Sequence, residues 1–452
     1  MSAQTERKPR QLPPVTLYFD VRDGAYWFEL KGRFIQLKKG ELVARLKRDF
    51  GYTEAPWDRG LREIDVPFLL AQDNNMIDYS GPLAGHKTGV YLDTSGRHCL
   101  ITESPRGIFD AKGQPVKYPK RAKKPELIGR IADELWPDED QWHLAIYWLK
   151  LGLESLRRGD FRPGQVFGLI GPSECGKSLW QDIITEVYGG RRADPFRYMM
   201  GLTQFNRDLA GAEHWQISDP RTTTDRRTRH EFGCMLKEAT VNSFFTVHQK
   251  GKDALVMPIF RRVSVSGNDE DENVAFWPPL EPSITDKIIM TICKRANVGK
   301  DRKAVWAQIL SEIDSFRAWL LSLPPVEKIA PAWANDRFGI KAWQHPDLVE
   351  ILTAMNAEMR LLQAIDQVFF STPQTELDSS YVEKKAADVE KEIRDSSYGF
   401  LVERLLSYSG ACGSLLKKLS LSIPDRVQKI TRRGEVFWRI ERPAPSEEKN
   451  GV

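Results

Sequence analysis

The eight residues at positions 171–178 are Gly171-Pro172-Ser173-Glu174-Cys175-Gly176-Lys177-Ser178. They match the phosphate-binding loop pattern G-x-x-x-x-G-K-[ST], in which backbone N–H groups cradle phosphate oxygens. The apolar stretch 166–170 before them predicts a buried strand, and residues 179–188 after them carry apolar side chains at helical spacing. A helix N-terminus that follows such a loop attracts anions. The sequence therefore predicts a nucleotide-binding loop, with Lys177 on the phosphates of ATP and the Ser178 hydroxyl on Mg²⁺.

The composition of the chain is that of an ordinary globular protein. Its 452 residues are enough for two to four domains, and 41% are hydrophobic and 28% charged. No apolar run approaches the length of a membrane span, and the polar first ten residues predict no secretory signal. The five cysteines form no C-x-x-C pair, so we expect a reducing, cytoplasmic location and neither a zinc site nor a disulfide framework. Because the formal net charge is only +4, nucleic-acid contacts have to come from local basic patches.

The pattern along the chain predicts an α/β fold: a P-loop ATPase core, a small α+β domain before it and a helical, winged-helix domain after it. Strand–loop–helix alternation from residue 160 onward favours a parallel sheet. Helical patterns over 345–370 and 382–393 follow, then helices over 400–408 and 413–419 and a hairpin. We expect a disordered leader over 1–14, an N-terminal collar or partner-binding domain over 15–110, a linker and helical collar over 111–158, the ATPase domain over 159–325, a helical region over 326–395, the winged helix over 396–442 and a disordered tail over 443–452.

An enzyme with this loop needs an acidic residue at the end of a neighbouring strand to hold Mg²⁺, and a second acid to activate water. The strand-like stretch 213–218 ends at Asp219, which we expect to hold the metal through water. The alternative is that Asp219 only forms a turn before Pro220. Because Pro220 stands where a glutamate is expected, hydrolysis is in question, although Asp225 or Glu213 could substitute.

A third strand-like stretch, 262–267, is followed by Asn268. Its amide could hydrogen-bond the attacking water or the γ-phosphate, but Gly-Asn-Asp is also an ordinary turn.

Two segments predict contacts with DNA. Residues 244–258 form two β-prone runs around a basic tip, so we expect a hairpin whose His248, Lys250 and Lys252 contact a nucleic-acid backbone. A solvated turn explains the same residues equally well. Residues 398–442 hold nine basic and four acidic side chains, and Arg432 and Arg433 at the tip of the C-terminal hairpin would suit phosphates or a minor groove. The alternative is a domain that packs on its neighbour and binds no DNA.

In this order the motifs resemble superfamily 3 helicases, the AAA+ replicative helicases of viruses, phages, plasmids and satellites. The resemblance is closest to the phage- and prophage-borne primase-helicase branch with the poxvirus-type enzymes. Further similar stretches lie at 81–85, 189–191, 201–206, 286–287 and 345–346.

The resemblance implies a hexameric ring with ATP between subunits. It assigns Asp219 as the acid of motif B, Asn268 as sensor 1 and the 248–252 hairpin as the element that grips DNA in the pore. It also implies an arginine finger from the neighbouring subunit. The candidates are Arg262, Lys287, Lys294 and Arg295.

Three functions are compatible with these residues. The first is an ATP-dependent DNA helicase or translocase of a mobile genetic element, which acts on single-stranded or forked DNA in replication. The second, motivated by Pro220, is an ATP-binding, hydrolysis-impaired assembly factor that recruits or blocks replication proteins. The third is a small-molecule kinase, which the basic hairpin, the winged helix and the lack of a recognisable lid disfavour.

Overall fold

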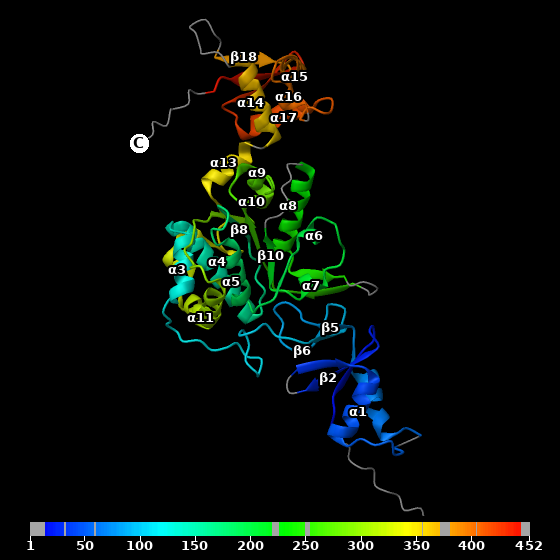
Figure 1. The fold of residues 1–452 in the computed structure, drawn as a ribbon. Helices are drawn as coiled ribbons and strands as arrows, with labels where there is room; N and C mark the ends of the chain where they lie inside the picture. The colour runs from blue at the N-terminus through cyan, green and yellow to red at the C-terminus, as the bar shows by residue number, and fades with distance from the viewer. Residues whose placement is uncertain are drawn as a thin grey trace, which may run out of the picture. The chain divides into compact units, whose positions relative to one another are not determined.

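The computed structural model describes residues 14–30, 33–57, 60–218, 226–248, 254–354, 356–370, 380–403 and 405–443. The chain divides into two compact units, which are described separately (Figure 1). The first comprises Met1–Phe276 with Glu281–His345, and the second comprises Trp277–Leu280 with Pro346–Val452. Within the described ranges, no helix combines the length and the apolar character needed to cross a membrane.

A six-stranded sheet forms the centre of the first unit, in the order β17-β14-β8-β13-β10-β9. Its strands are β8 (Val166–Ile170), β9 (Arg192–Ala193), β10 (His214–Ser218), β13 (Arg262–Gly267), β14 (Ile288–Ile292) and β17 (Trp343–Gln344). Every pairing is parallel, so all carboxyl ends lie at one edge, where open α/β sheets bind ligands. The mixed α/β fold with a central parallel sheet is therefore confirmed. All five residues of β8 are buried, as expected for a strand covered on both faces.

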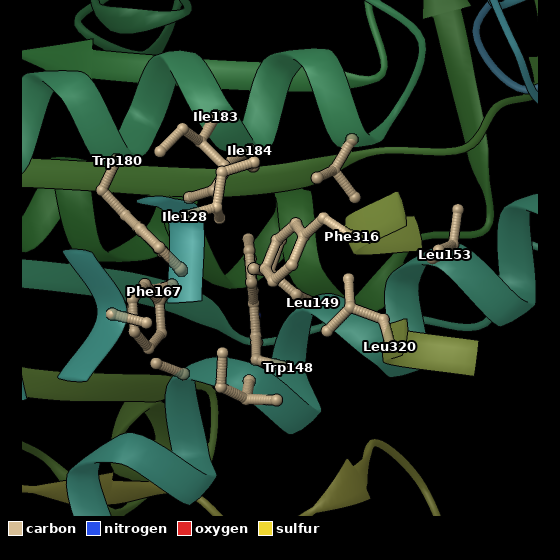
Figure 2. Packing of buried hydrophobic residues seen from close by; sticks show 14 of the residues in the cluster. Ile128, Trp148, Leu149, Leu153, Phe167, Trp180, Ile183, Ile184, Phe316 and Leu320 are labelled. Carbon is tan, nitrogen blue, oxygen red and sulfur yellow. The ribbon is translucent and has the colours of Figure 1, made fainter. Parts of the chain in front are cut away.

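Four helices pack around one large hydrophobic core beside β8 (Figure 1). They are α3 (Glu126–Leu135), α4 (Glu139–Arg158), α5 (Lys177–Val187) and α11 (Arg302–Ser322). Figure 2 shows Trp148 of α4 against Phe167 of β8, with ring centroids 5.1 Å apart, and Phe316 of α11 nearby. Trp180 of α5 is fully buried in the same cluster. Burial of such rings dominates core energetics, so this packing holds α5, and with it the loop before it, at the end of β8.

The first unit contains further sheets and helices. The N-terminal part has a sheet in the order β3-β2-β1-β4 and a smaller sheet in the order β5-β7-β6. The strands and helices here are β1 (Leu17–Asp20), β2 (Ala25–Leu30), β3 (Arg33–Leu37), α1 (Lys39–Phe50), the 3₁₀ turn η1 (Glu63–Asp65), α2 (Val66–Asn74), β4 (Met76–Ile77), β5 (Tyr79–Gly81), β6 (Gly89–Leu92) and β7 (His98–Ile101).

Asp20 joins the two N-terminal sheets. Its Oδ1 accepts hydrogen bonds from the backbone N–H groups of Arg22 (3.0 Å) and Asp23 (3.1 Å), and its Oδ2 accepts one from Ser80 Oγ (2.6 Å). The side chain is buried, and these three donors satisfy its carboxylate. Asp20 therefore has a structural role.

Shorter elements complete the first unit. They are α6 (Phe196–Met199), α7 (Arg207–Ala210), α8 (Arg226–Val241), β11 (Phe244–Val247), β12 (Leu255–Pro258), α9 (Asp271–Val274), α10 (Pro282–Thr285), α12 (Val326–Ile329), η2 (Pro331–Trp333), β15 (Ala334–Asn335) and β16 (Gly339–Ile340). Strands β11 and β12 pair antiparallel, which confirms the predicted hairpin.

The second unit is a helical cluster with a three-stranded antiparallel sheet in the order β18-β20-β19. Its elements are α13 (Pro346–Ala354), α14 (Ala357–Phe369), β18 (Tyr381–Lys384), α15 (Ala386–Asp395), α16 (Gly399–Val402), α17 (Ala411–Ser422), β19 (Val427–Arg432) and β20 (Glu435–Glu441). One core joins α14, α15, α17 and β20, so the predicted boundary at residue 396 falls inside it.

Three helical predictions in this unit were wrong in part. The pattern over 345–370 forms two helices, because Asn356 has an extended backbone and begins α14 anew. The pattern over 382–393 starts with strand β18, because Val382 pairs with Ile440 of β20. The helix expected over 400–408 ends at Val402.

Candidate nucleotide-binding site

Two glycines set the shape of the loop between β8 and α5. Gly176, the residue before the helix, has a φ of +115°, a region that favours glycine. At Gly171, an added Cβ would lie 2.4 Å from the backbone oxygen of Cys293. Because β14 ends just before Cys293, the loop can lie this close to the neighbouring strand only without a side chain at 171.

Lys177 lies at the centre of the site. It is only 6% exposed, and its Nζ donates hydrogen bonds to the backbone oxygens of Gly171 (2.7 Å) and Pro172 (2.8 Å). A third hydrogen bond, of 3.1 Å, goes to Oδ1 of Asn268, the residue after β13. The structure therefore brings together two residues that the sequence analysis selected separately. The ammonium group is turned onto the loop, where phosphate oxygens could replace the carbonyl acceptors.

A pocket of about 540 Å³ opens in front of the loop. This is within the range of small-molecule sites, which is roughly 300–1,000 Å³. One wall comes from the loop, α5 and the end of β13, and the other from residues between β14 and the first turns of α11. The first wall consists of Ser173, Glu174, Cys175, Gly176, Lys177, Ser178, Leu179, Asp182 and Asn268, and the second of Val298, Gly299, Arg302, Val305 and Trp306.

The second wall was not among the features predicted from the sequence. A signal for it was present, because Asp301 is a good N-cap residue and caps α11 by accepting hydrogen bonds from Lys303 N and Ala304 N. Apolar residues then recur at helical spacing, at Val305, Ile309, Ile313, Phe316 and Leu320.

The residues that the structure describes fit a nucleotide and only part of a metal site. Ser178 lines the pocket beside Lys177, as its predicted role requires. No group of three or more His, Cys, Asp and Glu side chains in the described ranges could hold a metal ion by itself. Asp219, Pro220 and Asp225 lie outside the described residues, so the metal role of Asp219 stays a prediction.

A buried polar network connects α5 to the strands beside it. His214 of β10 lies between Thr185 Oγ1 and Ser264 Oγ, each 2.7 Å from one ring nitrogen. Burial, with a smaller contribution from the positive Arg192, lowers the pKa of His214 to about 3, so the ring is neutral.

Gln181 of α5 extends this network to the carboxyl edge. Its Nε2 donates to Ser264 Oγ (2.9 Å) and to the backbone oxygen of Ile217 (3.1 Å), and its Oε1 accepts from Ser218 Oγ (3.0 Å). The polar residues of β10 therefore position the strand end that precedes residue 219 relative to the loop helix.

Glu213 cannot substitute for the missing second acid. It precedes β10 and so lies at the amino edge of the sheet, opposite the loop. It is fully buried, forms an ion pair with Arg191, and its Oε1 accepts a hydrogen bond from the backbone N–H of Gly85 (2.9 Å). Its carboxylate is a structural partner and reaches no water at the phosphate side.

Arg262 was a wrong candidate for the arginine finger. It begins β13 at the amino edge and is 2% exposed. Its Nη1 donates to the backbone oxygen of Arg162 (2.9 Å), and its guanidinium lies over the ring of Phe260. Burial lowers its pKa. A side chain enclosed in its own subunit cannot reach the nucleotide of a neighbour.

The other finger candidates differ in exposure. Lys287 also lies at the amino edge, is buried and pairs with Asp286 (2.5 Å). Lys294 and Arg295, after β14, are exposed at the carboxyl edge. Arg295 Nη2 is 3.4 Å from the backbone oxygen of Ser173, so Arg295 lies beside the loop of its own subunit.

A fully buried residue, Asn206, fastens strand β11 of the hairpin at the end that leads into the tip. Asn206 Oδ1 accepts a hydrogen bond from the backbone N–H of His248 (2.7 Å), and its Nδ2 donates to the backbone oxygen of Thr246 (2.9 Å). His248 thus occupies a defined position at the end of β11. Lys250 and Lys252 lie outside the described residues, and their contact with DNA stays a prediction.

The basic hairpin of the second unit is also formed. Arg432 ends β19 and forms an ion pair with Glu383 of β18, at 2.6 Å. Arg433 has a φ of +49° in the turn and is exposed. The Arg432 side chain is 63% exposed, so a phosphate can approach its guanidinium beside Glu383.

The chain is similar in fold to the C-terminal region of NrS-1. The apo structure of that region (305–718) aligns with 95% of this chain and 96% of its own, at a TM-score of 0.57 and 14% identity. An A form of the same region gives a TM-score of 0.55, also at 14% identity and with the same coverage. At this identity the likeness concerns the fold alone.

Weaker likenesses support no conclusion. A structure described as the active helicase Cch of SCCmec type IV aligns over 97% of this chain and 95% of its own, but at a TM-score of 0.38 and 10% identity. No family model matches the sequence, and no curated protein does.

Proposed function

We propose that this chain is an ATP-dependent DNA helicase or translocase of a mobile genetic element, which acts in DNA replication in the cytoplasm as a ring oligomer, with six subunits as the expected number. The contact between Lys177 Nζ and Asn268 Oδ1 carries the proposal. It joins the phosphate-binding loop to the strand end where superfamily 3 helicases have their sensor amide, at the carboxyl edge of a parallel sheet. The order of the motifs and the fold likeness support it.

Each loop residue has a part in this proposal. The backbone N–H groups of 173–176 and the Lys177 ammonium hold the phosphates, and Cys175 lies buried within the loop. Asn268 orients the attacking water or the γ-phosphate. Ser178 and Asp219 are the residues that would hold Mg²⁺, which neutralises charge on the phosphates when bound.

Contact with DNA is assigned to the hairpin, because Asn206 fixes the end of β11 next to its tip. Asn206 holds His248 in place, and Lys250 and Lys252 follow at the tip. Phosphate contacts of this kind are independent of sequence and weaken with salt. We assign Arg432 and Arg433 to a second contact, by a winged helix built from the second unit, and the N-terminal domain to replication proteins.

The test is ATP turnover with and without single-stranded or forked DNA. Wild-type protein should hydrolyse ATP faster with DNA and unwind a fork. Asn206→Ala should bind ATP normally but lose the stimulation, because the end of β11 next to the hairpin tip is released. A matched control is Asn242→Ala, which changes an asparagine that takes no part in the hydrogen bonds between Asn206 and the hairpin. Well-folded protein without DNA-stimulated turnover would contradict the proposal.

Pro220 favours a second candidate, an ATP-binding assembly factor that hydrolyses ATP poorly and recruits or blocks replication proteins on DNA. Proline has no carboxylate to activate water. This candidate predicts ATP-dependent oligomers, seen by light scattering, with little turnover. Pro220→Glu should then raise the rate. Brisk turnover by the wild-type protein would exclude the second candidate and leave the first.

A further inference from the structure

We propose that residues 298–306 form a base-holding wall, against which the nucleobase stacks on Trp306, and that this wall does not select adenine. The inference rests on the proposed nucleotide binding and extends it to the class of substrate. It predicts a site for nucleoside triphosphates in general.

The two walls of the pocket have different chemistry. The loop wall offers backbone N–H groups and Lys177, which suit phosphates. In a nucleoside triphosphate, the base is at the opposite end from the γ-phosphate. The base-holding wall is the remaining lining of the pocket, with Val298, Gly299, Arg302, Val305 and Trp306. Val298, Val305 and Trp306 are half-buried and pack on the large core, so the core supports the wall from behind.

The N-terminus of α11 does not turn this wall into a second phosphate site. Helix N-termini attract anions through their free N–H groups. Here the Asp301 carboxylate already accepts hydrogen bonds from the N–H groups of Lys303 (3.0 Å) and Ala304 (3.1 Å). A negative charge thus occupies the helix end, and the wall presents mainly the side chains of Val305 and Trp306.

The side chains of this wall are poorly suited to distinguish one base from another. Reading a base by hydrogen bonds requires a fixed pattern of donors and acceptors, as an amide side chain provides for adenine. Among the five wall residues that line the pocket, only Arg302 and the indole N–H of Trp306 offer polar side-chain groups, and both can only donate. Stacking tolerates every base, because each has a π-face. Affinity should therefore come from the phosphates and from stacking.

Isothermal titration calorimetry on the full chain tests this inference with two ligands, ATP and inorganic tripolyphosphate. Trp306→Ala should weaken ATP binding by roughly ten- to a hundredfold, the range expected for one lost base–aromatic stack. Tripolyphosphate binding should change by less than about twofold, because the Ala variant leaves the loop intact. Trp306→Phe, which keeps an aromatic face, should bind ATP nearly as the wild type does.

The wild-type protein gives a second readout that needs no variant. GTP and CTP should bind within about tenfold of ATP, because stacking is base-tolerant. A preference for ATP of a hundredfold or more would overturn the inference. So would a Trp306→Ala variant that binds ATP as the wild type does, or one that loses ATP and tripolyphosphate equally. Loss of both ligands in Lys177→Ala shows that the proposed phosphate site stands, whatever Trp306 does; unchanged binding in Lys177→Ala would instead refute that site.

Discussion

The two edges of the central sheet both carry charged residues, but these residues are held in opposite ways. At the carboxyl edge, Lys177 donates to two loop carbonyls and to Asn268, and a pocket opens beside it. At the amino edge, Glu213 and Arg262 are closed in by partners of their own subunit. The difference lies in access: at the carboxyl edge a ligand can replace the present acceptors, and at the amino edge it cannot.

The direction of the strands explains this difference. In a parallel sheet, loops at the carboxyl ends converge at a crevice, while the amino ends are covered by the connections that return from the helices. A buried charge at the covered edge persists only if it is paired. Arg262 begins β13 at the covered edge, and Asn268 follows β13 at the open edge. Only five residues lie between them, but only Asn268 is placed where a ligand can reach it.

The largest expected effect comes from Lys177→Ala. We expect DNA-stimulated phosphate release to fall by roughly a hundredfold or more, as for removal of a preorganised donor from developing charge. The unfolding transition should change little, because the lost hydrogen bonds lead to loop carbonyls beside the pocket. Phosphate release and thermal unfolding measure the two quantities.

Lys287→Ala is the matched control, a buried lysine at the other edge. It should lower stability and leave turnover per folded molecule unchanged. If Lys287→Ala abolished turnover without destabilising the protein, the contrast between the edges would be wrong.

Glu213→Gln is expected to destabilise the protein by about 3 kcal/mol, the lower end for breaking a buried ion pair, because Arg191 keeps 15% exposure. The Arg191 guanidinium would remain near an amide that cannot balance its charge. Urea unfolding measures the loss, and nucleotide affinity below the transition should be unchanged. Glu174→Gln, at an exposed acid of the loop, is the comparison that should leave stability intact. A stable but inactive Glu213→Gln protein would return Glu213 to the catalytic candidates.

How much the sequence predicts depends on how local the signal is. The loop, strand β8 and the hairpin β11–β12 follow from adjacent residues, and the structure confirms these elements. The contact between Lys177 and Asn268 is also a local consequence. Asn268 comes directly after a strand, and Lys177 comes at the end of the loop that follows another strand. The edge on which Glu213 and Arg262 lie depends on strand order and direction, which composition does not reveal.

Two other features depended on pairing between distant segments. Strand β18 has a charged sequence, YVEK, that continues without a break into helix α15, and only pairing with β20 makes it a strand. Trp306 lies far from Lys177 in the chain, and a common core brings α11 beside α5.

His214, at the amino edge, should affect the stability of the protein and not its activity, and its lowered pKa makes this testable. Its folded-state pKa is about 3, below the usual 6.5, so the unfolded chain takes up a proton first as the pH falls. The stabilising contribution is complete above pH 6.5 and is lost progressively between pH 6.5 and about 3. Between pH 6.5 and pH 5 this amounts to roughly 2 kcal/mol. Urea midpoints at both pH values, at constant ionic strength, measure it.

His214→Gln is the control for this pH dependence, because an amide can still bond to Thr185 and Ser264 but does not titrate. Its loss of stability over the same pH interval should be smaller than that of the wild type by the same amount. Equal losses in the two proteins would show that other groups are responsible.

The smallest expected effect concerns the remaining arginine candidate at the carboxyl edge. Arg295 is exposed and its Nη2 lies 3.4 Å from the backbone oxygen of Ser173, so its charge would lie near the phosphates of a nucleotide bound at its own subunit's loop, as proposed. We expect Arg295→Ala to slow turnover by about tenfold, the effect of losing roughly 1.4 kcal/mol of transition-state stabilisation. Stability should not change. Arg262→Met should show the reverse, with lower stability and normal turnover.

Mixing experiments decide on which subunit Arg295 acts. A finger supplied to a neighbour restores activity when Arg295→Ala subunits are mixed with Lys177→Ala subunits. An interface is then complete where the Arg295→Ala subunit supplies Lys177 and the Lys177→Ala subunit supplies Arg295. An arginine that acts on its own loop gives no such recovery. The distance to Ser173 favours action within the subunit, so we expect turnover in the mixture to equal the sum of the separate proteins.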